Sequence, residues 1–272
     1  MKQLRSSSQN LRELFEQNIS IRYIAEPLTS FDVTSLSTEV FAFMEKQDYD
    51  VVGIRQDGLV IGYVRKTDLA ISTIKDHLNR FTASDVDMVD ETAPLLDALK
   101  ILRLSPCIFV RVLGRVGGIV THGDLQKAPV RMWLFGLISL IEMQMLRLIR
   151  EEYPRGEWES YISPKRLIHA NKILEDRRKR NVAIDLTDCL EWCDKSEIIL
   201  KGGLFKGIGL SSKKQGEKFF YDLEKLRNNL AHAQDIMTGY WPGIGDLVEK
   251  AETLLKLLEK PEFSKKEIAN DD

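Results

Sequence analysis

Cysteine and histidine are scarce in this sequence of 272 residues, which holds three cysteines and four histidines. An odd number of cysteines in a chain of this size, with no signal peptide at its start, argues against a disulfide framework and predicts a cytoplasmic protein. Cys189 and Cys193 share a predicted helix face, but two thiols without a second pair make a poor zinc site. We therefore expect no bound metal, and core positions for these two thiols.

The sequence also lacks a long apolar run and an excess of charge of either sign. Its longest apolar stretch, 133–141, is interrupted by Glu142 and is well short of the roughly 20 residues that a membrane-spanning helix needs. Lys and Arg number 39 against 41 Asp and Glu, so no overall field draws the chain to nucleic acid. The glycines of 202–209 lack the Gly-Lys-Ser/Thr of a phosphate-binding loop. We expect a protein that does not bind membranes and whose RNA contacts, if any, are local.

A segment that occurs twice organises the first half of the chain. Residues 58–69 (GLVIGYVRKTDL) align with residues 114–125 (GRVGGIVTHGDL) at a constant offset of 56, and the glycines, the apolar positions and the final Asp-Leu fall in register. Gly58 and Gly114 stand where a hairpin needs a positive φ. Each copy follows a helix-type apolar pattern and a strand-type run, at 40–44 and 51–54 and again at 95–104 and 107–112. Each repeat is thus predicted to run helix, strand, turn, strand, helix.

This repeat resembles the CBS domain, and its two copies resemble the tandem pair of such domains, over about residues 18–128. The resemblance implies a pair of α/β repeats that binds an adenine nucleotide (AMP, ADP or ATP) as a regulatory ligand. In the family, a Gly and a Thr-x-x-Asp segment hold the nucleotide, with the Asp on the ribose hydroxyls and the Thr on the phosphate. The first repeat has Arg in place of this Thr, a planar cation that can meet a phosphate. The implied nucleotide-binding residues are Gly62, Arg65, Asp68, Gly118, Thr121 and Asp124.

For Asp68 and Asp124 the alternative is plain helix capping, which explains the aspartates but not the paired glycine and threonine.

Beyond residue 128 the apolar pattern is that of helices alone. Helices are predicted at about 130–152, 163–180, 186–200, 214–236 and 243–259, which indicates an all-α bundle. The whole chain is therefore predicted to be an α+β protein of two domains, with 1–128 holding repeats at about 18–75 and 80–128, 129–260 forming the bundle, and a polar tail at 261–272. Only 126–130 separate the last repeat from the first helix, so no flexible linker uncouples the domains.

The predicted helix at 214–236 carries polar side chains that suggest chemistry. Asn228 and His232 are four residues apart and project from one helix face, and Arg227 has the reach to join them. The segment R-N-N-L-A-H resembles the R-x(4–6)-H motif of the HEPN superfamily. That resemblance, over about 130–260, implies a HEPN-like bundle that forms a homodimer with its motifs facing each other.

The same resemblance implies a metal-independent ribonuclease that cuts RNA to a 2′,3′-cyclic phosphate and a 5′-hydroxyl. Histidine takes up or releases a proton near neutral pH, so His232 suits the acid and base roles when the ribose 2′-OH attacks the neighbouring phosphate. Arg227 would hold the phosphate oxygens, and Asn228 would orient the histidine or the substrate. Glu142 is isolated on an apolar helix, and a buried carboxylate needs a cation or donors, so we expect it to pair with Arg227.

Three other interpretations stay open. Arg, Asn and His near a helix end can serve only as C-terminal caps, a bundle of this type can bind RNA or a partner without cleaving, and the repeat pair alone would suit a regulatory subunit of a transporter or metabolic enzyme. The leading hypothesis is a homodimer in which a bound nucleotide opens or closes a composite RNA-cleaving site. A basic cluster that can touch the RNA backbone, although a solvated helix end is the commoner meaning, comprises Arg177, Arg178, Lys179 and Arg180.

Overall fold

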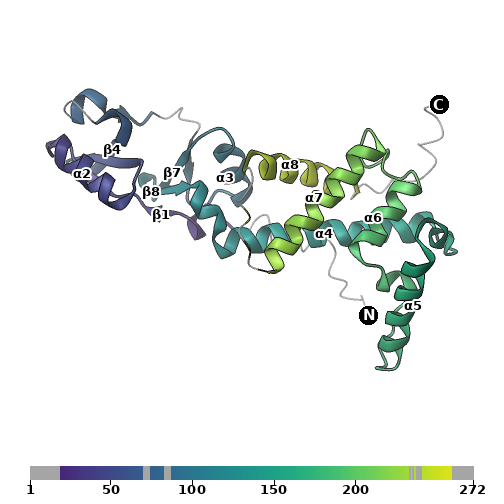
Figure 1. Ribbon diagram of the computed structural model, residues 1–272. Coiled ribbons are helices and arrows are strands. Elements are labelled where there is room, and N and C mark those ends of the chain that lie inside the picture. The colour runs from purple at the N-terminus through teal and green to yellow at the C-terminus, as the bar shows by residue number, and fades with distance from the viewer. Residues whose placement is uncertain are drawn as a thin grey trace. The chain divides into compact units, whose positions relative to one another are not determined.

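The computed structural model describes residues 19–69, 74–82, 87–232, 234, 236 and 241–258, and the expected polar tail at 261–272 lies outside them. Contacts within the chain divide it into two compact units, with the boundary between Val130 and Arg131. Among the described residues, every strand precedes this boundary, and only helices follow it (Figure 1). The predicted mixed α+β class is therefore confirmed.

Two four-stranded sheets form the first unit. The first sheet has the strand order β2 (Ser30–Asp32), β3 (Val51–Gln56), β4 (Leu59–Arg65) and β5 (Asn79–Arg80). The second has the order β1 (Glu26–Pro27), β8 (Arg115–Thr121), β7 (Cys107–Val112) and β6 (Met88–Asp90). The helices of this unit are α2 (Ser37–Gln47) before β3, α3 (Leu95–Leu102) before β7, and the short 3-10 helices η1 (Ile21–Tyr23), η2 (Lys66–Asp68), η3 (Ile74–His77) and η4 (His122–Gln126).

The two sheets repeat each other's details at the sequence offset. Asp57 and Gly58 join β3 to β4, and Leu113 and Gly114 join β7 to β8, with φ values of 52°, 78°, 50° and 79°. Two successive residues with positive φ make the type I′ turn that suits a tight hairpin. The register also shifts at equivalent positions of the two hairpins. Where the sequence predicted a closing helix for each repeat, the described residues form the short 3-10 helices η2 and η4 directly after the hairpins.

The short strands β1 and β5 are exchanged between the repeats. β1 comes before the first repeat in the chain but pairs with β8 of the second, and β5 comes before the second repeat but pairs with β4 of the first. Glycines stand where the exchanged strands cross. A Cβ on Gly62 would lie 2.2 Å from the carbonyl oxygen of Asn79, and one on Gly118 would lie 3.3 Å from that of Glu26. The two repeats are therefore interlocked by reciprocal strand exchange.

An aromatic cluster lies between the two sheets. The ring of Tyr63 on β4 is 4.6 Å from that of Phe109 on β7, and the ring of Phe81 is 4.8 Å from Phe109. Leu28 and Cys107 are buried in the same cluster. Aromatic pairs at these distances add to the stability that comes from area burial alone, so packing reinforces the strand exchange.

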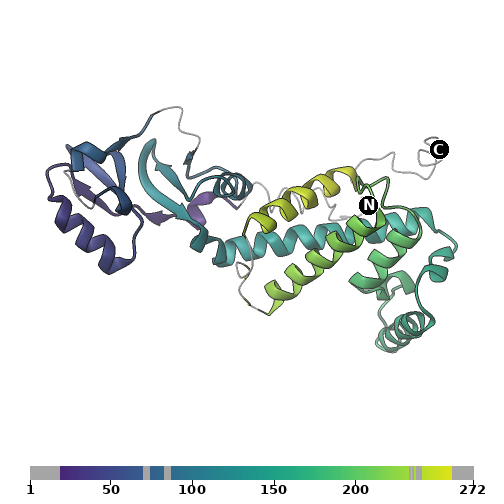
Figure 2. The same cartoon turned by 45° about the horizontal axis from the view of Figure 1, so that its top comes forward.

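The second unit is helical, and its helices lie close to the predicted positions. Figure 2 shows α7 and α8 running along α4. The fourth predicted helix is shorter than expected, because it ends at Ala231 and His232 is its C-cap residue. The elements are α4 (Ala128–Glu152), η5 (Glu157–Tyr161), α5 (Pro164–Arg178), η6 (Leu186–Cys189), α6 (Trp192–Lys201), α7 (Lys213–Ala231) and α8 (Trp241–Leu258).

The helix α4 supplies much of the core of this unit. Trp133, Ile138, Ile141 and Met145 are at most 1% exposed. By length and composition alone α4 would pass as a membrane-spanning helix, a test that the core helix of a soluble bundle also passes, and 61% of its most apolar window is buried. Its side chains also hold the neighbouring helices, since Arg147 donates a hydrogen bond to the backbone carbonyl at the end of α8.

Replacing Gly62 with alanine should destabilise the first unit, because the added Cβ would overlap the Asn79 carbonyl oxygen and push β5 away from β4. We expect the free energy of unfolding to fall by about 1–3 kcal/mol, the usual effect of overpacking. Urea denaturation followed by circular dichroism measures this change. Gly117→Ala is the matched control, because nothing lies within 4 Å of its added Cβ, and it should change the free energy by less than about 0.5 kcal/mol. Equal effects of the two substitutions would contradict the close approach of β5.

Candidate functional site

A cavity of about 810 Å³ in the first unit is lined by four stretches of the chain. Two of them, 26–29 and 48–51, belong to the first repeat and its lead-in. The other two belong to the second repeat: 106–107, and residues 119 and 121–124 at the end of β8 and the start of η4. Strand exchange is what brings 26–29 beside β8. The cavity is therefore a joint product of both repeats.

Asp124 and Thr121 form a fixed pair on the wall of this cavity. Thr121 donates to one carboxylate oxygen of Asp124 from its backbone N–H, at 2.7 Å, and from its hydroxyl, at 3.0 Å, which completes a capping box at the start of η4. The other carboxylate oxygen pairs with Nζ of Lys127 at 2.8 Å. Asp124 is only 7% exposed, so its carboxylate is held in one place with most of its surface out of water.

Lys127 ties this pair to the exchanged strand. Its Nζ also donates to the carbonyl oxygen of Ile24, at 2.7 Å, and to the carboxylate of Glu26. Partial burial opposes the lysine charge, but the hydrogen bonds to Asp124 and Glu26 outweigh that effect and raise the pKa of Lys127. Lys127 was not among the residues predicted from the sequence, although it follows Asp124 by three residues, the spacing of an ion pair across one helical turn.

Cys107 closes one side of the cavity without adding reactivity. Burial raises the pKa of its thiol to about 11, and the charge of Asp87 acts in the same direction, whereas that of Arg65 opposes it. A thiol that stays protonated at neutral pH is a weak nucleophile. Cys107 is therefore an apolar part of the wall.

The predicted nucleotide-binding residues divide into three groups. Thr121 and Asp124 line the cavity. Gly62 and Gly118 instead lie where the exchanged strands cross, so the packing of β5 and β1 accounts for both glycines. The capping interpretation is also observed at Asp124, which does cap η4 while it faces the cavity.

The remaining two predicted residues, Arg65 and Asp68 of the first repeat, do not line this cavity. The guanidinium of Arg65 lies over the ring of Tyr63, 5.8 Å from its centroid. Asp68 accepts a hydrogen bond from the hydroxyl of Thr67 at 3.0 Å. The structure therefore does not bring the first-repeat residues together with Thr121 and Asp124.

The R-N-N-L-A-H segment forms the C-terminal end of α7. Asn228 and His232 are exposed, whereas the side chain of Arg227 is 29% exposed. Arg227 donates a hydrogen bond to the side-chain oxygen of Asn228 at 3.3 Å. Within the described part of the chain, no hydrogen bond or ion pair engages the His232 imidazole. The structure thus joins Arg227 to Asn228 and presents His232 to solvent.

The carbonyl groups at the end of α7 are satisfied by a different helix. Arg131 of α4 donates to the backbone oxygens of Asn229 and Leu230, at 3.0 and 3.2 Å, and to that of Gln234 at 2.9 Å. Arg131 therefore does the capping that sequence reasoning had offered as the simpler role for the motif side chains.

Glu142 of α4 lies between two cations. Its carboxylate is 2.8 Å from Nζ of Lys195 and 3.9 Å from a guanidinium nitrogen of Arg227. The guanidinium of Arg227 also lies over the ring of Trp192, 5.9 Å from its centroid. Glu142 does approach Arg227 as predicted, but its closer partner is Lys195. The sequence position of Lys195 could have indicated that it is buried, because it lies on the apolar stripe of α6, three residues after Trp192 and three before Ile198.

The basic cluster lies far from the motif. Arg177 and Arg178 form the last turn of α5, and both act electrostatically on Cys189 in η6. Arg150, near the end of α4, donates hydrogen bonds to Asp185 and Asp188 in and beside η6. Arg131, near the start of α4, donates to the backbone of the motif at the end of α7. These two arginines are 19 positions apart on α4, a separation of about 28 Å along the helix axis. The exposed group Arg177, Arg178, Lys179 and Arg180 is therefore a solvated helix end, separate from the motif.

No family model and no curated protein matches this chain. Solved structures similar to about two fifths of it include the CBS-pair protein CBSX2 from Arabidopsis thaliana, with 14% identity, a TM-score of 0.37 and coverage of 42% of this chain and 95% of that one. Another is the CBS domain of a bacterial CNNM/CorC family Mg2+ transporter in complex with ATP, with 16% identity, a TM-score of 0.35 and coverage of 45% and 94%. A third is a CBS domain pair in complex with 5-methylthioadenosine and S-adenosyl-L-methionine, with 20% identity, a TM-score of 0.33 and coverage of 39% and 95%.

Replacing Glu142 with glutamine should destabilise the helical unit, because it leaves the buried ammonium of Lys195, 9% exposed, without a counter-charge. We expect a loss of about 1–3 kcal/mol in the free energy of unfolding, measured by urea denaturation. Glu197→Gln is the matched control, since its ion pair with Lys201 is at the surface and is worth less than about 1 kcal/mol. Adding Lys195→Met to Glu142→Gln should restore most of the lost stability. No recovery in the double variant would show that the pair is not the cause.

Proposed function

We propose that the first unit is a sensor for an adenosine-containing ligand, which binds in the cavity formed jointly by the two repeats. The observation that carries this proposal is the fixed, largely buried carboxylate of Asp124 on the cavity wall. A carboxylate has acceptor capacity for about four hydrogen bonds. Three are taken by Thr121 and Lys127, and the capacity that remains suits a ribose hydroxyl.

The rest of the lining suits the two halves of a nucleoside. Apolar side chains of Leu28, Val51 and Ile119 share the wall with the polar groups of Thr121 and Asp124. The adenine ring would pack against the apolar side chains, and the ribose hydroxyls would form hydrogen bonds with the polar groups. The volume of about 810 Å³ lies within the range of small-ligand sites. A ligand that touches both repeats would stabilise their mutual arrangement, which is how binding would be sensed.

Asp124→Asn should weaken the binding of adenosine by at least about tenfold, because the amide keeps one acceptor oxygen but loses the charge that attracts hydroxyl donors. Isothermal titration calorimetry measures the affinity. Asp68→Asn makes the same change at the equivalent position of the first repeat, outside this cavity, and should leave the affinity within about twofold. Equal weakening by both substitutions, or none by Asp124→Asn, would place the ligand elsewhere.

A second candidate function is that of a metal-independent endoribonuclease of the HEPN type, in the helical unit. The observation that favours it is the segment at the end of α7, where Arg131 satisfies the helix carbonyls and leaves Asn228 and His232 exposed. Arg227 is held by Glu142 and Trp192, and its guanidinium would bind the phosphate oxygens of RNA. The exposed His232 would exchange protons with the ribose 2′-OH or the leaving 5′-oxygen.

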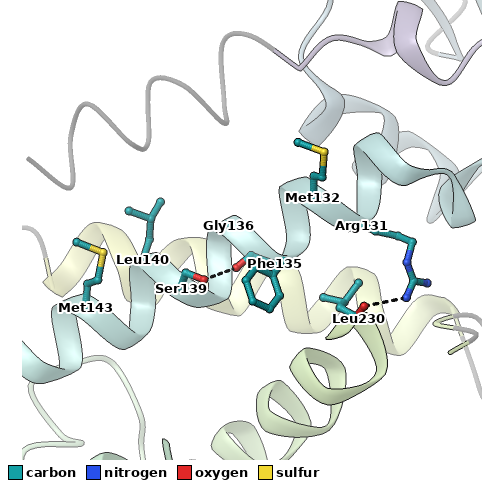
Figure 3. Close-up of a pocket in the computed structure, with 8 residues that line it drawn as sticks. All are labelled: Arg131, Met132, Phe135, Gly136, Ser139, Leu140, Met143 and Leu230. Carbon is teal, nitrogen blue, oxygen red and sulfur yellow. Dashed lines mark hydrogen bonds between the residues drawn. The ribbon is translucent and has the colours of Figure 1, made fainter. Parts of the chain in front are cut away.

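Two motifs would be needed for separate acid and base, so this candidate includes a homodimer. An apolar groove of about 520 Å³ runs along α4 beside Leu230, which lies between the two exposed motif residues (Figure 3). In it the side chains of Met132, Phe135 and Met143 are 60%, 45% and 45% exposed, and apolar side chains that gather at a surface often mark an interaction site.

The groove has the pattern of a face that packs on a second copy of itself. Its α4 residues pair by size about the midpoint between positions 137 and 138, with Met132 matching Met143, Phe135 matching Leu140 and Gly136 matching Ser139. In an antiparallel helix pair across a twofold axis, each residue faces its mirror position, so methionine would meet methionine and the two small residues would meet at the crossing. The partner of this face is therefore a second copy of the chain.

His232→Ala should lower cleavage of unstructured RNA in EDTA by about 100-fold or more, the usual effect of losing a general acid or base. His169→Ala removes another exposed imidazole, which pairs with Glu191 at 3.3 Å, and should leave the rate within about twofold.

Phe135→Glu should disrupt the proposed dimer, so the variant should be a monomer by light scattering and should lose cleavage of RNA. Ile168→Glu, at a side chain 70% exposed on α5, should stay dimeric and active.

The outcomes separate the candidates. Wild-type protein that cleaves as a monomer contradicts the composite site. Wild-type protein that dimerises and binds adenosine but cleaves no RNA leaves a non-catalytic, ligand-responsive interaction protein, the alternative that the sequence had kept open.

A further inference from the structure

We infer that the cavity selects an adenosine derivative without phosphate groups, neutral or positively charged at its 5′ position, over AMP or ATP. This inference rests on the proposed sensor function and names the class of ligand. It departs from the nucleotide expected from the sequence. The charges around the cavity carry it.

The described residues that line the cavity include four carboxylates and no lysine or arginine. The carboxylates are those of Glu26, Asp48, Asp50 and Asp124. A ligand in the cavity therefore meets acidic groups from both repeats.

Nearby lysines neutralise these carboxylates only in part. Lys127 is shared between Asp124 and Glu26. Lys66 is shared among three further carboxylates, at 3.3 Å from Glu45, 4.0 Å from Asp48 and 3.9 Å from Asp50. Two lysines thus serve the four carboxylates of the cavity and also Glu45, which does not line it, so at least two of the four cavity charges (four minus two) stay uncompensated.

Arg65 does not remove this excess. It is close enough to act on the Cys107 thiol of the cavity wall, but Asp87 acts on the same thiol with opposite sign. The positive charge of Arg65 and the negative charge of Asp87 cancel, so the excess of negative charge around the cavity is unchanged.

An excess of negative charge around a cavity disfavours a polyphosphate and favours a neutral or cationic ligand. The side chains of Asp48 and Asp50 are 99% and 91% exposed, so water and salt screen them and the preference will be moderate, on the order of tenfold at low ionic strength. The carboxylates can still bind the ribose, because its hydroxyls donate hydrogen bonds that carboxylates accept.

The test is calorimetric titration of the full chain at low ionic strength with adenosine, S-adenosylmethionine, and ATP with EDTA. Adenosine and S-adenosylmethionine should bind about tenfold more tightly than ATP, and the difference should shrink as salt is added. Removing two charges with Asp48→Asn/Asp50→Asn should narrow the difference by raising the affinity for ATP. Asp57→Asn is the matched control, since it changes the net charge at an exposed hairpin turn away from the cavity and should leave the difference unchanged.

ATP that binds as tightly as adenosine in EDTA, or a preference that Asp48→Asn/Asp50→Asn does not alter, overturns the charge-based selection and leaves the sensor function standing. If none of the three ligands binds, the adenosine site itself is wrong, and this inference is overturned with it. A titration of ATP with excess Mg²⁺ separates a further outcome. Tight binding only with the cation would mean that the carboxylates recruit a metal–phosphate complex, and it also overturns the inference.

Discussion

The reciprocal exchange of β1 and β5 is the constraint on which the first unit depends. Each exchanged strand belongs to one repeat by its place in the chain and to the other by its hydrogen bonds, so neither sheet is complete without residues from both sides. The glycines at the crossings follow from this, because a side chain at Gly62 would displace the backbone of Asn79. The cavity follows as well, since its wall at 26–29 is present only because β1 has crossed to β8. A ligand bound there would contact both repeats and so depend on how they are held together.

In the helical unit a partly buried cluster of charged side chains stabilises the packing of the helices. The carboxylate of Glu142 satisfies the buried ammonium of Lys195 and lies near the guanidinium of Arg227. Trp192 restricts the same guanidinium from one side. An arginine held by a carboxylate and an aromatic ring keeps its orientation without substrate, and this preorganisation is what a phosphate-binding group requires. The exposed His232, by contrast, is left free to move, so its placement depends on whatever covers the end of α7.

Much of the fold was predictable, because repeats and periodicity are local properties of a sequence. The offset of 56 residues predicted the two hairpins, and positive φ values at Gly58 and Gly114 followed from turn geometry. Strand exchange was not predictable, because two-residue strands such as β1 carry no pattern of their own. Part of the cavity was unpredictable for the same reason. Asp124 and Thr121 were found through a motif, whereas residues 26–29 and 48–51 reach the cavity only through the tertiary arrangement. Lys195 was missed because a lysine on an apolar stripe looks like an interruption until its partner is known.

The two repeats match in backbone but not in charge, and under the proposed sensor function this asymmetry favours a ligand at the second repeat's motif. In the second repeat Thr121 holds Asp124 with two hydrogen bonds, and Lys127 neutralises it. The positions 56 residues earlier are Arg65, Asp68 and Ile71. The first repeat thus has neither the threonine nor the lysine at the matching positions, and in the described part of the chain its aspartate accepts a hydrogen bond from the neighbouring Thr67. An aspartate without these supports is less firmly positioned, so the free energy of ribose binding would have to cover the ordering of its side chain. Among the described residues, the duplicated fold therefore supplies two scaffolds that differ in polar support, and the second is the one that would preorganise the proposed nucleoside site.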